Sequence, residues 1–416
     1  MAVAALPLLV ETPALAPAPH RDLCTDCGVS RSSWAHQCGK ACQFIHPRYE
    51  ALERQVHGRA RDLGRGDEAF FGVHRAMYRA RLDVPRAGAQ WTGITTRLGE
   101  RLLETGAVDA VLATASDVTD RWRPRPVIIT SPEGMAACRG MKMGYSPLLA
   151  LLDECVARGY RRIAMIGVAC QVHALRALEA ELGFEALYVI GTPCSDNTTT
   201  ENFHRFLGLL TDTPDEVTYL EFLADYRVEL RFRDGSHRFI PFLQLPIRDL
   251  PRDFFPATCR SCFDYTNSLS DLTVGYMGGE GDQWLLIRTA RGEALLDLIR
   301  DEVTVTAPGS RGDRTGPVKT FVALSERAAG GLPVRGAPDW ARPLIGWAQR
   351  RFGPKGLEFA RTRVEMKCAE GILALRHERP HRMKRMIPGF AWDLVARYGL
   401  TPRPGERLQT PQETTG

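Results

Sequence analysis

Four cysteines within residues 24–42, CTDCGVSRSSWAHQCGKAC, have the types and spacing of a metal centre. The pattern is C-x2-C-x10-C-x3-C, in which Cys24 and Cys27 can hold one centre from a tight turn. Cys38 and Cys42 are four residues apart, so a helix would place both on one face. Such a set of thiols suits zinc, an iron–sulfur cluster or disulfides.

The redox setting of the chain removes one of these options. The first 20 residues include a short apolar stretch, but they lack the basic leader of a signal peptide and carry Glu11. We therefore expect a disordered tail on a cytoplasmic protein, whose thiols stay reduced. Eleven cysteines in such a chain indicate metal binding. Spacing alone leaves zinc and a 4Fe–4S cluster equally open.

Length and composition exclude several classes of function. A chain of 416 residues predicts two or three domains, and 44% hydrophobic with 25% charged residues is typical of globular proteins. The net charge of +5 is too small to indicate nucleic-acid binding. No apolar run approaches the roughly 18 residues that a membrane span needs.

Strands and helices alternate through the first half of the chain. The apolar runs 108–114 and 125–131 are bounded by polar turns, which predicts buried strands. The pattern then predicts a helix over 146–159, a strand over 161–170, a helix over 171–183 and a strand over 185–194. Strand–helix–strand order indicates an α/β fold with a mainly parallel sheet.

A second group of cysteines is dispersed along the sequence. Cys170 and Cys194 fall just past the ends of two expected strands, where open α/β sheets bind ligands. Cys259 and Cys262 form another C-x2-C pair that could complete a four-thiol site with them. Ligands from such distant segments are unlike the local pairs of a zinc ribbon, and they suit a cluster buried beside a cofactor.

The second half of the chain adds different elements. After a capped helix over 198–210, residues 217–242 alternate around an Asp-Gly pair, which predicts a β-hairpin. Two strands and a helix follow within 271–303, and residues 306–340, rich in Gly, Pro and Arg, indicate a loop. A last helix has an apolar face formed by Leu357, Ala360, Val364, Cys368, Ile372 and Leu375.

Several ordered motifs resemble one known family. They are AQWTGITT (89–96), GVACQVHALR (167–176), GTPCSDNTT (191–199), CRSCFDYTNSLSDLTVGYMG (259–278), QWLLIRTARG (283–292) and GLEFAR (356–361). The chain is similar, from about residue 20 to about residue 400, to the coenzyme F420 hydrogenase/dehydrogenase beta-subunit family. Within that family it is most similar to the ferredoxin-dependent branch of chlorophyll metabolism.

The resemblance implies an FAD-containing α/β protein with two 4Fe–4S clusters and reduced ferredoxin as electron donor. It assigns the flavin-proximal cluster to Cys170, Cys194, Cys259 and Cys262. Cys24, Cys27 and Cys42 match three ligands of the ferredoxin-facing cluster, but Ser30 stands where the family has the fourth cysteine. A serine oxygen is a poor cluster ligand because its hydroxyl must ionise. We therefore expect Cys38 to be the fourth ligand, with zinc at this site as the weaker alternative.

The same resemblance divides the chain and suggests further site residues. We expect a tail (1–20), an iron–sulfur module (21–60), a flavin-side α/β part (61–165), a cluster- and flavin-binding α/β part with the added hairpin (166–305), a loop (306–340) and a helical, basic C-terminal segment (341–416). Flavin contacts are expected at Thr92, Gly93, Lys142, Asn197 and Thr198. Helix caps and a surface lysine are the alternative interpretation of those five residues. Candidate proton donors are His173, Asp264 and Tyr265, for each of which a structural role in the core is commoner.

Other residues receive structural or docking interpretations. Cys155 and Cys368 are expected on apolar helix faces, Trp91 is expected to pack, and Cys138 stays unassigned. The run RHERPHRMKR (376–385) has five Lys or Arg residues and is either a docking face for an acidic ferredoxin or a solvated helix end.

The implied activity is reduction of a chlorophyll-type tetrapyrrole, namely of the 8-vinyl group of 3,8-divinyl (proto)chlorophyllide to ethyl. Reduction of a 7-hydroxymethyl group to methyl is the alternative within the family. A deazaflavin-linked electron-transfer subunit of a larger dehydrogenase is a second alternative, and a zinc-stabilised binding protein is the third. A homo-oligomer is compatible with the sequence.

Overall fold

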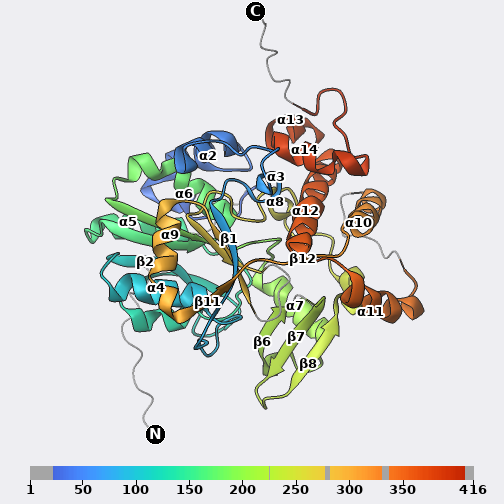
Figure 1. Ribbon diagram of the computed structural model, residues 1–416, viewed down its shortest axis with the longest axis horizontal. Coiled ribbons are helices and arrows are strands. Elements are labelled where there is room, and N and C mark those ends of the chain that lie inside the picture. Colours follow the sequence, from blue (N-terminus) through green and yellow to red (C-terminus); the bar gives the residue numbers. More distant parts are fainter. Residues whose placement is uncertain (1–21, 224, 277–281, 330–336, 408–416) are drawn as a thin grey trace, which may run out of the picture.

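An eight-stranded mixed sheet forms the centre of the molecule (Figure 1). The computed structural model describes residues 22–223, 225–276, 282–329 and 337–407, so the expected tail lies outside the described residues. The order across the sheet is β11-β1-β10-β9-β5-β4-β2-β3. Its strands are β1 (Ala76–Leu82), β2 (Ala110–Ser116), β3 (Pro124–Ile129), β4 (Arg162–Gly167), β5 (Ala186–Gly191), β9 (Leu272–Gly275), β10 (Gln283–Ile287) and β11 (Val303–Thr306).

The middle of this sheet is parallel. Strands β2, β4, β5 and β9 pair in parallel, and Gly167 at the end of β4 lies opposite Gly191 at the end of β5. The outer strands β3, β10, β1 and β11 are antiparallel to their neighbours. The predicted α/β fold with a mainly parallel core is therefore confirmed. Its register brings the chain segments after β4 and β5 to the same edge.

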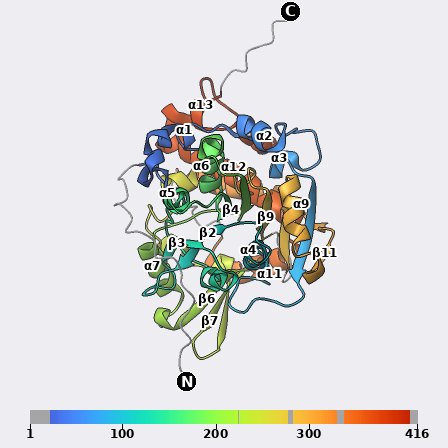
Figure 2. The same ribbon diagram turned by 90° about the vertical axis from the view of Figure 1, so that its left-hand side faces the viewer.

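Helices cover both faces of the sheet (Figure 2). On one face α4 (Ile94–Glu104) and α9 (Ala290–Asp297) pack on alternate strand residues such as Val111 and Ala113. On the other face α5 (Leu152–Ala157) and α6 (Ala169–Leu182) pack on Leu112 and its neighbours. This alternation follows from the two-residue repeat of a strand that is buried on both faces.

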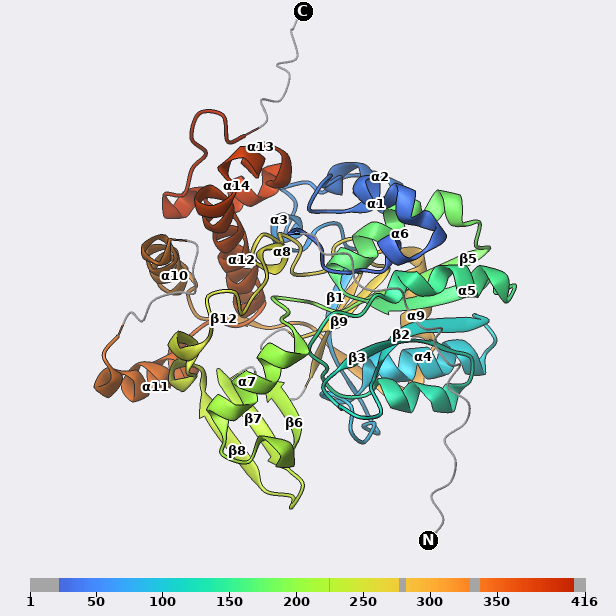
Figure 3. The ribbon, with the colours of Figure 1, turned by 180° about the vertical axis from the view of Figure 1, so that it is seen from behind.

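A smaller antiparallel sheet lies beside the large one (Figure 3). It contains β6 (Val217–Phe222), β7 (Arg227–Phe232) and β8 (His237–Pro241), and its turn at Asp234 and Gly235 confirms the predicted hairpin. Helix α7 (Thr200–Leu210) packs its aromatic side chains on this sheet. The Thr199 hydroxyl caps α7 by accepting from the amide of Asn202.

The two ends of the described chain meet above the large sheet (Figure 2). The N-terminal helices are α1 (Cys38–Ala41), α2 (Tyr49–His57) and α3 (Glu68–Phe71). The later helices are α8 (Ala257–Arg260), α10 (Thr315–Ala328), α11 (Arg342–Phe352), α12 (Leu357–Glu378), α13 (Met383–Met386) and α14 (Gly389–Val395), and β12 (Ser310–Arg311) pairs with β13 (Lys355–Gly356). All six residues of the expected apolar face of α12 are buried.

Two sequence expectations need correction. The loop expected over 306–340 is wrong in part, because Thr315–Ala328 forms helix α10, with Val318 and Val322 buried one turn apart. The helix expected over 146–159 is shorter and begins as the 3-10 turn Leu148–Leu151 (η4), which α5 continues to Ala157.

Candidate functional site

Four of the cysteines lie at the edge where β4 and β5 end. Cys170 is in the first turn of α6, whose amino end favours a thiolate, and Cys194 follows β5. The amide of Cys194 donates to the carbonyl of Tyr265 at 3.1 Å. The side-chain amide of Asn267 donates to the carbonyl of Gly167 at 2.8 Å. These bonds fix the segment that carries Cys259 and Cys262 against the strand ends.

A glycine at the end of β5 permits this close approach. A Cβ atom on Gly191 would lie 2.7 Å from the side chain of Asn267, so a larger residue would push the segment away. The segment 259–267 can therefore reach the sheet only because β5 ends in glycine.

The four thiols of this edge are neighbours, with Cys259 buried and the other three partly buried. Burial raises the pKa of Cys194 well above its usual value, and the nearby thiols of Cys259, Cys170 and Cys262 raise it further. Burial likewise raises the pKa of Cys259, and that of Cys262 to about 12. Buried thiols that repel one another when ionised become thiolates when a metal supplies positive charge. The donor set therefore fits an iron–sulfur cluster.

A buried lysine from α12 supplies positive charge at this edge. The ammonium of Lys367 donates to Asp196 at 2.6 Å and to Glu370 at 2.7 Å, and the lysine side chain is only 4% exposed. Burial opposes its charge, but the two carboxylates raise the pKa of Lys367. Its charge in turn lowers the pKa of Cys259 and of Cys262. Sequence reasoning missed this residue.

The four N-terminal cysteines form a second set. Cys38 begins α1 and Cys42 ends it, with the amide of Cys42 bonded to the carbonyl of Cys38, so the two do share one helical turn. Burial raises the pKa of Cys27, and the thiols of Cys170, Cys42 and Cys38 raise it further. Burial also raises the pKa of Cys42 to about 11, with contributions from Cys38 and Cys24. Cys38 thus lies near Cys27 and Cys42.

Glycine again permits the docking of this N-terminal module. Gly28 has a φ of +110°, and a Cβ atom there would lie 2.3 Å from the backbone nitrogen of Ala150 in η4. The carbonyl of Cys27 accepts from the amide of Leu149 at 2.9 Å. The module is held on η4 by backbone contacts that a side chain at position 28 would break.

Cys170 connects the two sets. Burial raises its pKa, a hydrogen bond from the Thr25 side chain lowers it, and the Cys24 thiol raises it. The two groups of thiols are therefore adjacent, which is the arrangement that short-range electron transfer needs. Within the part of the chain that is described, no group of three or more Cys, His, Asp or Glu side chains closes around a single metal ion. A zinc ion requires four ligands about 2.3 Å away, whereas the cubic core of a 4Fe–4S cluster holds its thiolates farther apart.

The loops that carry the expected flavin residues meet beside the sheet. The guanidinium of Arg139 donates to the carbonyl of Ala87 at 3.2 Å, which joins the loop of Lys142 to the loop before α4. The side chain of Asn197 donates to the carbonyl of Gly144 at 2.6 Å and accepts from its amide at 3.2 Å. The structure thus brings together three segments that are distant in sequence.

Each of these five residues also has a local structural partner. Thr92 accepts from the amide of Leu82 and donates to the Gln283 side chain, and Gly93 precedes α4 with a φ of +88°. Thr198 donates to the carbonyl of Phe254. The ammonium of Lys142 donates to three carbonyls, those of Cys138, Arg139 and Gly140, and burial lowers its pKa to about 8.

A group of aromatic side chains lies next to these loops. The ring of Tyr276 lies 5.2 Å from that of Trp91 and 5.1 Å from that of Phe359 in α12. Among the described residues, the buried hydroxyl of Tyr276 has no hydrogen-bond partner. The Trp91 and Tyr276 rings are tilted by 36° and the Phe359 ring lies edge-on to Tyr276. An unsatisfied buried donor beside aromatic side chains fits a bound heteroaromatic cofactor. The GYMG segment was the sequence signal for Tyr276, but an aromatic residue at a strand end is too common to single out.

The three candidate proton donors differ in their surroundings. His173 is fully buried and neutral, because Nδ1 donates to the carbonyl of Ala41 and Nε2 accepts from the amide of Arg48, and burial lowers its pKa to about 4. Asp264 accepts from the amide and hydroxyl of Ser268, and burial raises its pKa. Both side chains thus bind the protein itself.

Tyr265 differs from these two residues. Its buried ring lies 5.9 Å from the guanidinium carbon of Arg363, and it contacts Cys194 through the backbone bond described above. Burial raises its pKa, and Arg363 lowers it. Of the three candidates, Tyr265 is thus the one whose side chain faces a cation from α12.

The remaining cysteines and the basic run have defined places. Cys155 and Cys368 are fully buried on helices, as expected. Cys138 ends the 3-10 turn Pro132–Cys138, and burial raises its pKa to about 11. In the basic run, the guanidinium of Arg379 lies 3.5 Å from the Asp22 carboxylate, next to the N-terminal cysteines.

Comparison with known proteins identifies the family. Residues 77–153 match the N-terminal region, and residues 160–310 the C-terminal region, of the coenzyme F420 hydrogenase/dehydrogenase beta subunit. The chain is 37% identical to 7-hydroxymethyl chlorophyll a reductase, chloroplastic, of Oryza sativa subsp. japonica, over 94% of this chain and 86% of that protein. The chain belongs to this beta-subunit family.

Two further comparisons show similarity in sequence and in fold. An uncharacterized protein of Nostoc sp. strain PCC 7120 is 38% identical over 92% of this chain and 95% of its own length. A chain of the F420-reducing [NiFe] hydrogenase complex from Methanosarcina barkeri has a similar fold, with a TM-score of 0.53 and 18% identity over 72% of this chain and 91% of that one. No helix in the described ranges is long and apolar enough to span a bilayer.

Proposed function

We propose that this beta-subunit homologue is an iron–sulfur flavoprotein that uses reduced ferredoxin to reduce a chlorophyll-type tetrapyrrole. The observation that carries the proposal is the pair of adjacent four-thiol sets, one at the strand ends and one in the N-terminal module. Cys170, Cys194, Cys259 and Cys262 would hold one 4Fe–4S cluster. Cys24, Cys27, Cys38 and Cys42 would hold the other.

The bound groups would supply one-electron transfer through the clusters and storage of an electron pair in FAD. The chain's own residues orient and shield them. Trp91 and Tyr276 offer aromatic rings and a hydroxyl that has no partner among the described residues, and the loops of Lys142 and Asn197 border them. Lys367 places a fixed positive charge beside the strand-end thiols.

Electron entry is proposed at the N-terminal module. Ferredoxins are usually acidic, and a basic face close to the entry cluster would speed their association. The exposed side chains of Lys384 and Arg385 lie on the segment whose Arg379 reaches Asp22, two residues before Cys24. This contact supports the docking interpretation of the basic run over that of a free helix end.

For the substrate, we propose the 8-vinyl group of a 3,8-divinyl (proto)chlorophyllide, which takes up two electrons and two protons to become ethyl. The named plant relative favours a second candidate, reduction of a 7-hydroxymethyl group to methyl with loss of water. The motifs that the chain shares with the family do not separate the two substrates. Tyr265, beside Arg363 and Cys194, is the proposed proton donor among the three candidates.

The test begins with anaerobic purification. We expect about eight iron, eight sulfide and one FAD per chain, and no zinc. The purified protein is then incubated with reduced ferredoxin and divinyl chlorophyllide and, separately, with reduced ferredoxin and 7-hydroxymethyl chlorophyll a. The products are separated by chromatography. Conversion of the first substrate alone supports the proposal, and conversion of the second alone replaces it by the second candidate. A colourless, iron-free preparation or a stoichiometric second subunit that oxidises deazaflavin would overturn it.

A further inference from the structure

Helix α11 carries its large apolar side chains on the side that faces solvent. Its outward side carries Leu344, Trp347 and Phe352, which are 64%, 52% and 66% exposed, and Trp340 in the turn before it is 81% exposed. Residues 340, 344 and 347 follow one another at intervals of four and three, so they lie along one strip of the helix. We call Trp340, Leu344, Trp347 and Phe352 the outer face of α11.

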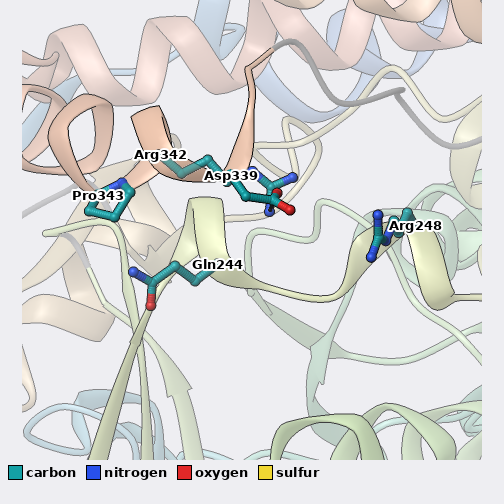
Figure 4. A pocket seen from close by; sticks show the side chains of 5 residues that line it. All are labelled: Gln244, Arg248, Asp339, Arg342 and Pro343. Atoms are coloured by element: carbon teal, nitrogen blue, oxygen red, sulfur yellow. Dashed lines mark ion pairs between the residues drawn. The ribbon is translucent and has the colours of Figure 1, made fainter.

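The polar side of α11 faces the protein. Gly346 is the buried residue of the helix, and a Cβ atom there would lie 4.0 Å from the Leu243 side chain of the neighbouring turn. Arg342 has an 11% exposed side chain and pairs with Asp339 at 3.3 Å. Figure 4 shows both residues with Gln244 around a hollow of about 330 Å³. A helix that stabilised only its own fold would show the opposite arrangement, with apolar side chains inward.

Such an outer face is unusual for a surface that meets only water. Soluble proteins seldom expose contiguous apolar patches of several large side chains. The outward aromatic rings contact each other, with Trp347 and Phe352 centroids 5.9 Å apart. These aromatic side chains therefore form an exposed apolar surface that is available for binding a partner.

The charges of α11 indicate what kind of partner fits. The helix sequence RPLIGWAQRRF has three arginines and no acidic residue. Arg351 is exposed and lies over the Phe352 ring at 5.7 Å, within the apolar strip. The same helix of a second copy would offer Arg351 no acidic partner, because α11 has no Asp or Glu. An anionic lipid surface offers phosphates for arginine and an apolar layer for Trp, Leu and Phe.

We propose that the outer face of α11 docks this protein peripherally on anionic lipid bilayers. The side chains of Trp340, Leu344, Trp347 and Phe352 enter the headgroup region, and Arg351 binds lipid phosphate. The helix does not span the bilayer, since it has only eleven residues. The proposal does not depend on the proposed activity, because it concerns a surface remote in sequence from both cysteine sets and needs no substrate.

The test is flotation of the holoprotein with vesicles. One set contains phosphatidylglycerol and phosphatidylcholine, and the other contains phosphatidylcholine alone. The variant is Leu344→Ser/Trp347→Ser/Phe352→Ser. The matched control is Val84→Ser/Val118→Ser, which removes apolar side chains that are 71% and 85% exposed elsewhere. Circular dichroism checks the fold of both variants, and light scattering gives the mass of each without lipid.

We expect the wild type and the control to float with anionic vesicles, and the affinity of the triple variant to fall roughly tenfold or more. Added salt should weaken binding, and so should the absence of phosphatidylglycerol. Equal flotation of the triple variant would overturn the proposal. So would a wild type that ignores vesicles but forms an oligomer that the triple variant loses, since the outer face would then join copies of the chain.

Discussion

Lys367 in α12 and Asp196, two residues past Cys194, form a buried ion pair whose Nζ–Oδ1 distance is 2.6 Å. The pair ties the C-terminal helix to the edge of the sheet where Cys170, Cys194, Cys259 and Cys262 gather. It therefore has both a structural and an electrostatic consequence, and the two can be separated by substitution.

The Lys367→Met variant should shift the reduction potential of the strand-end cluster to more negative values, because a fixed cation that favours the added electron is lost. It should also lower the free energy of unfolding by about 1–3 kcal/mol, since the partly buried carboxylates of Asp196 and Glu370 lose their partner. Lys367→Arg keeps the charge and should keep the potential. Potentiometric titration followed by electron paramagnetic resonance measures the shift. Lys319→Met removes an exposed lysine of α10, outside both cysteine sets, and should leave the potential unchanged.

Substitution of a strand-end cysteine should remove one cluster and leave the other. We expect Cys194→Ser to lower the iron content from about eight to about four atoms per chain. Cys155→Ser removes a buried thiol outside both sets and should retain all the iron. Full iron in Cys194→Ser would contradict the assigned ligands.

The fourth N-terminal ligand can be tested by exchange. Cys38→Ser should lower the iron content by about four atoms per chain, because serine replaces a thiolate of the second set. Adding Ser30→Cys to that variant should restore iron if position 30 holds the family's usual ligand. Iron and sulfide analysis with Mössbauer spectroscopy reads both outcomes, and an unchanged Cys38→Ser protein would exclude Cys38 as a ligand.

Gly28 should be less tolerant of a side chain than most glycines of the fold. We expect Gly28→Ala to destabilise the N-terminal module by about 1–3 kcal/mol or more, through the positive φ and the contact with the backbone of η4. Gly58→Ala is the matched control, because Gly58 also has a positive φ but has open space around its Cα. Urea unfolding and limited proteolysis near residue 28 compare the two.

Acid should weaken the contact between the N-terminal module and α6. The pKa of His173 is about 4 in the folded chain and about 6.5 when unfolded, so the unfolded state binds the extra proton between these values. Its contribution is fully present above pH 6.5 and is lost as pH falls towards 4, by about 3 kcal/mol at most. His173→Gln should flatten this part of the stability curve, measured by urea unfolding from pH 7 to 4.5. His381→Gln, at an exposed position, should not.

The parts of the fold that depend on local pattern could be predicted from the sequence. The strands ending near Cys170 and Cys194 and the Asp234–Gly235 hairpin follow from apolar runs and turn residues, and the resemblance supplied the grouping of cysteines. Helix α10 was missed because the Gly and Pro residues around it outweighed the spacing of Val318 and Val322. Lys367 and Tyr276 were missed for another reason. Their roles come from contacts with residues far away in sequence, which no local pattern encodes.

The two cysteine sets become available at different times during synthesis. Cys24–Cys42 leave the ribosome as one short segment, whereas the strand-end set is incomplete until Cys262 has emerged. Lys367, which balances the charge of the strand-end set, emerges about a hundred residues later still. A buried cluster site of this kind is complete only when α12 packs on it. Insertion of the cluster is therefore coupled to completion of the chain. Truncated chains that end before α12 would therefore retain an open, oxygen-accessible set of thiols at the strand ends.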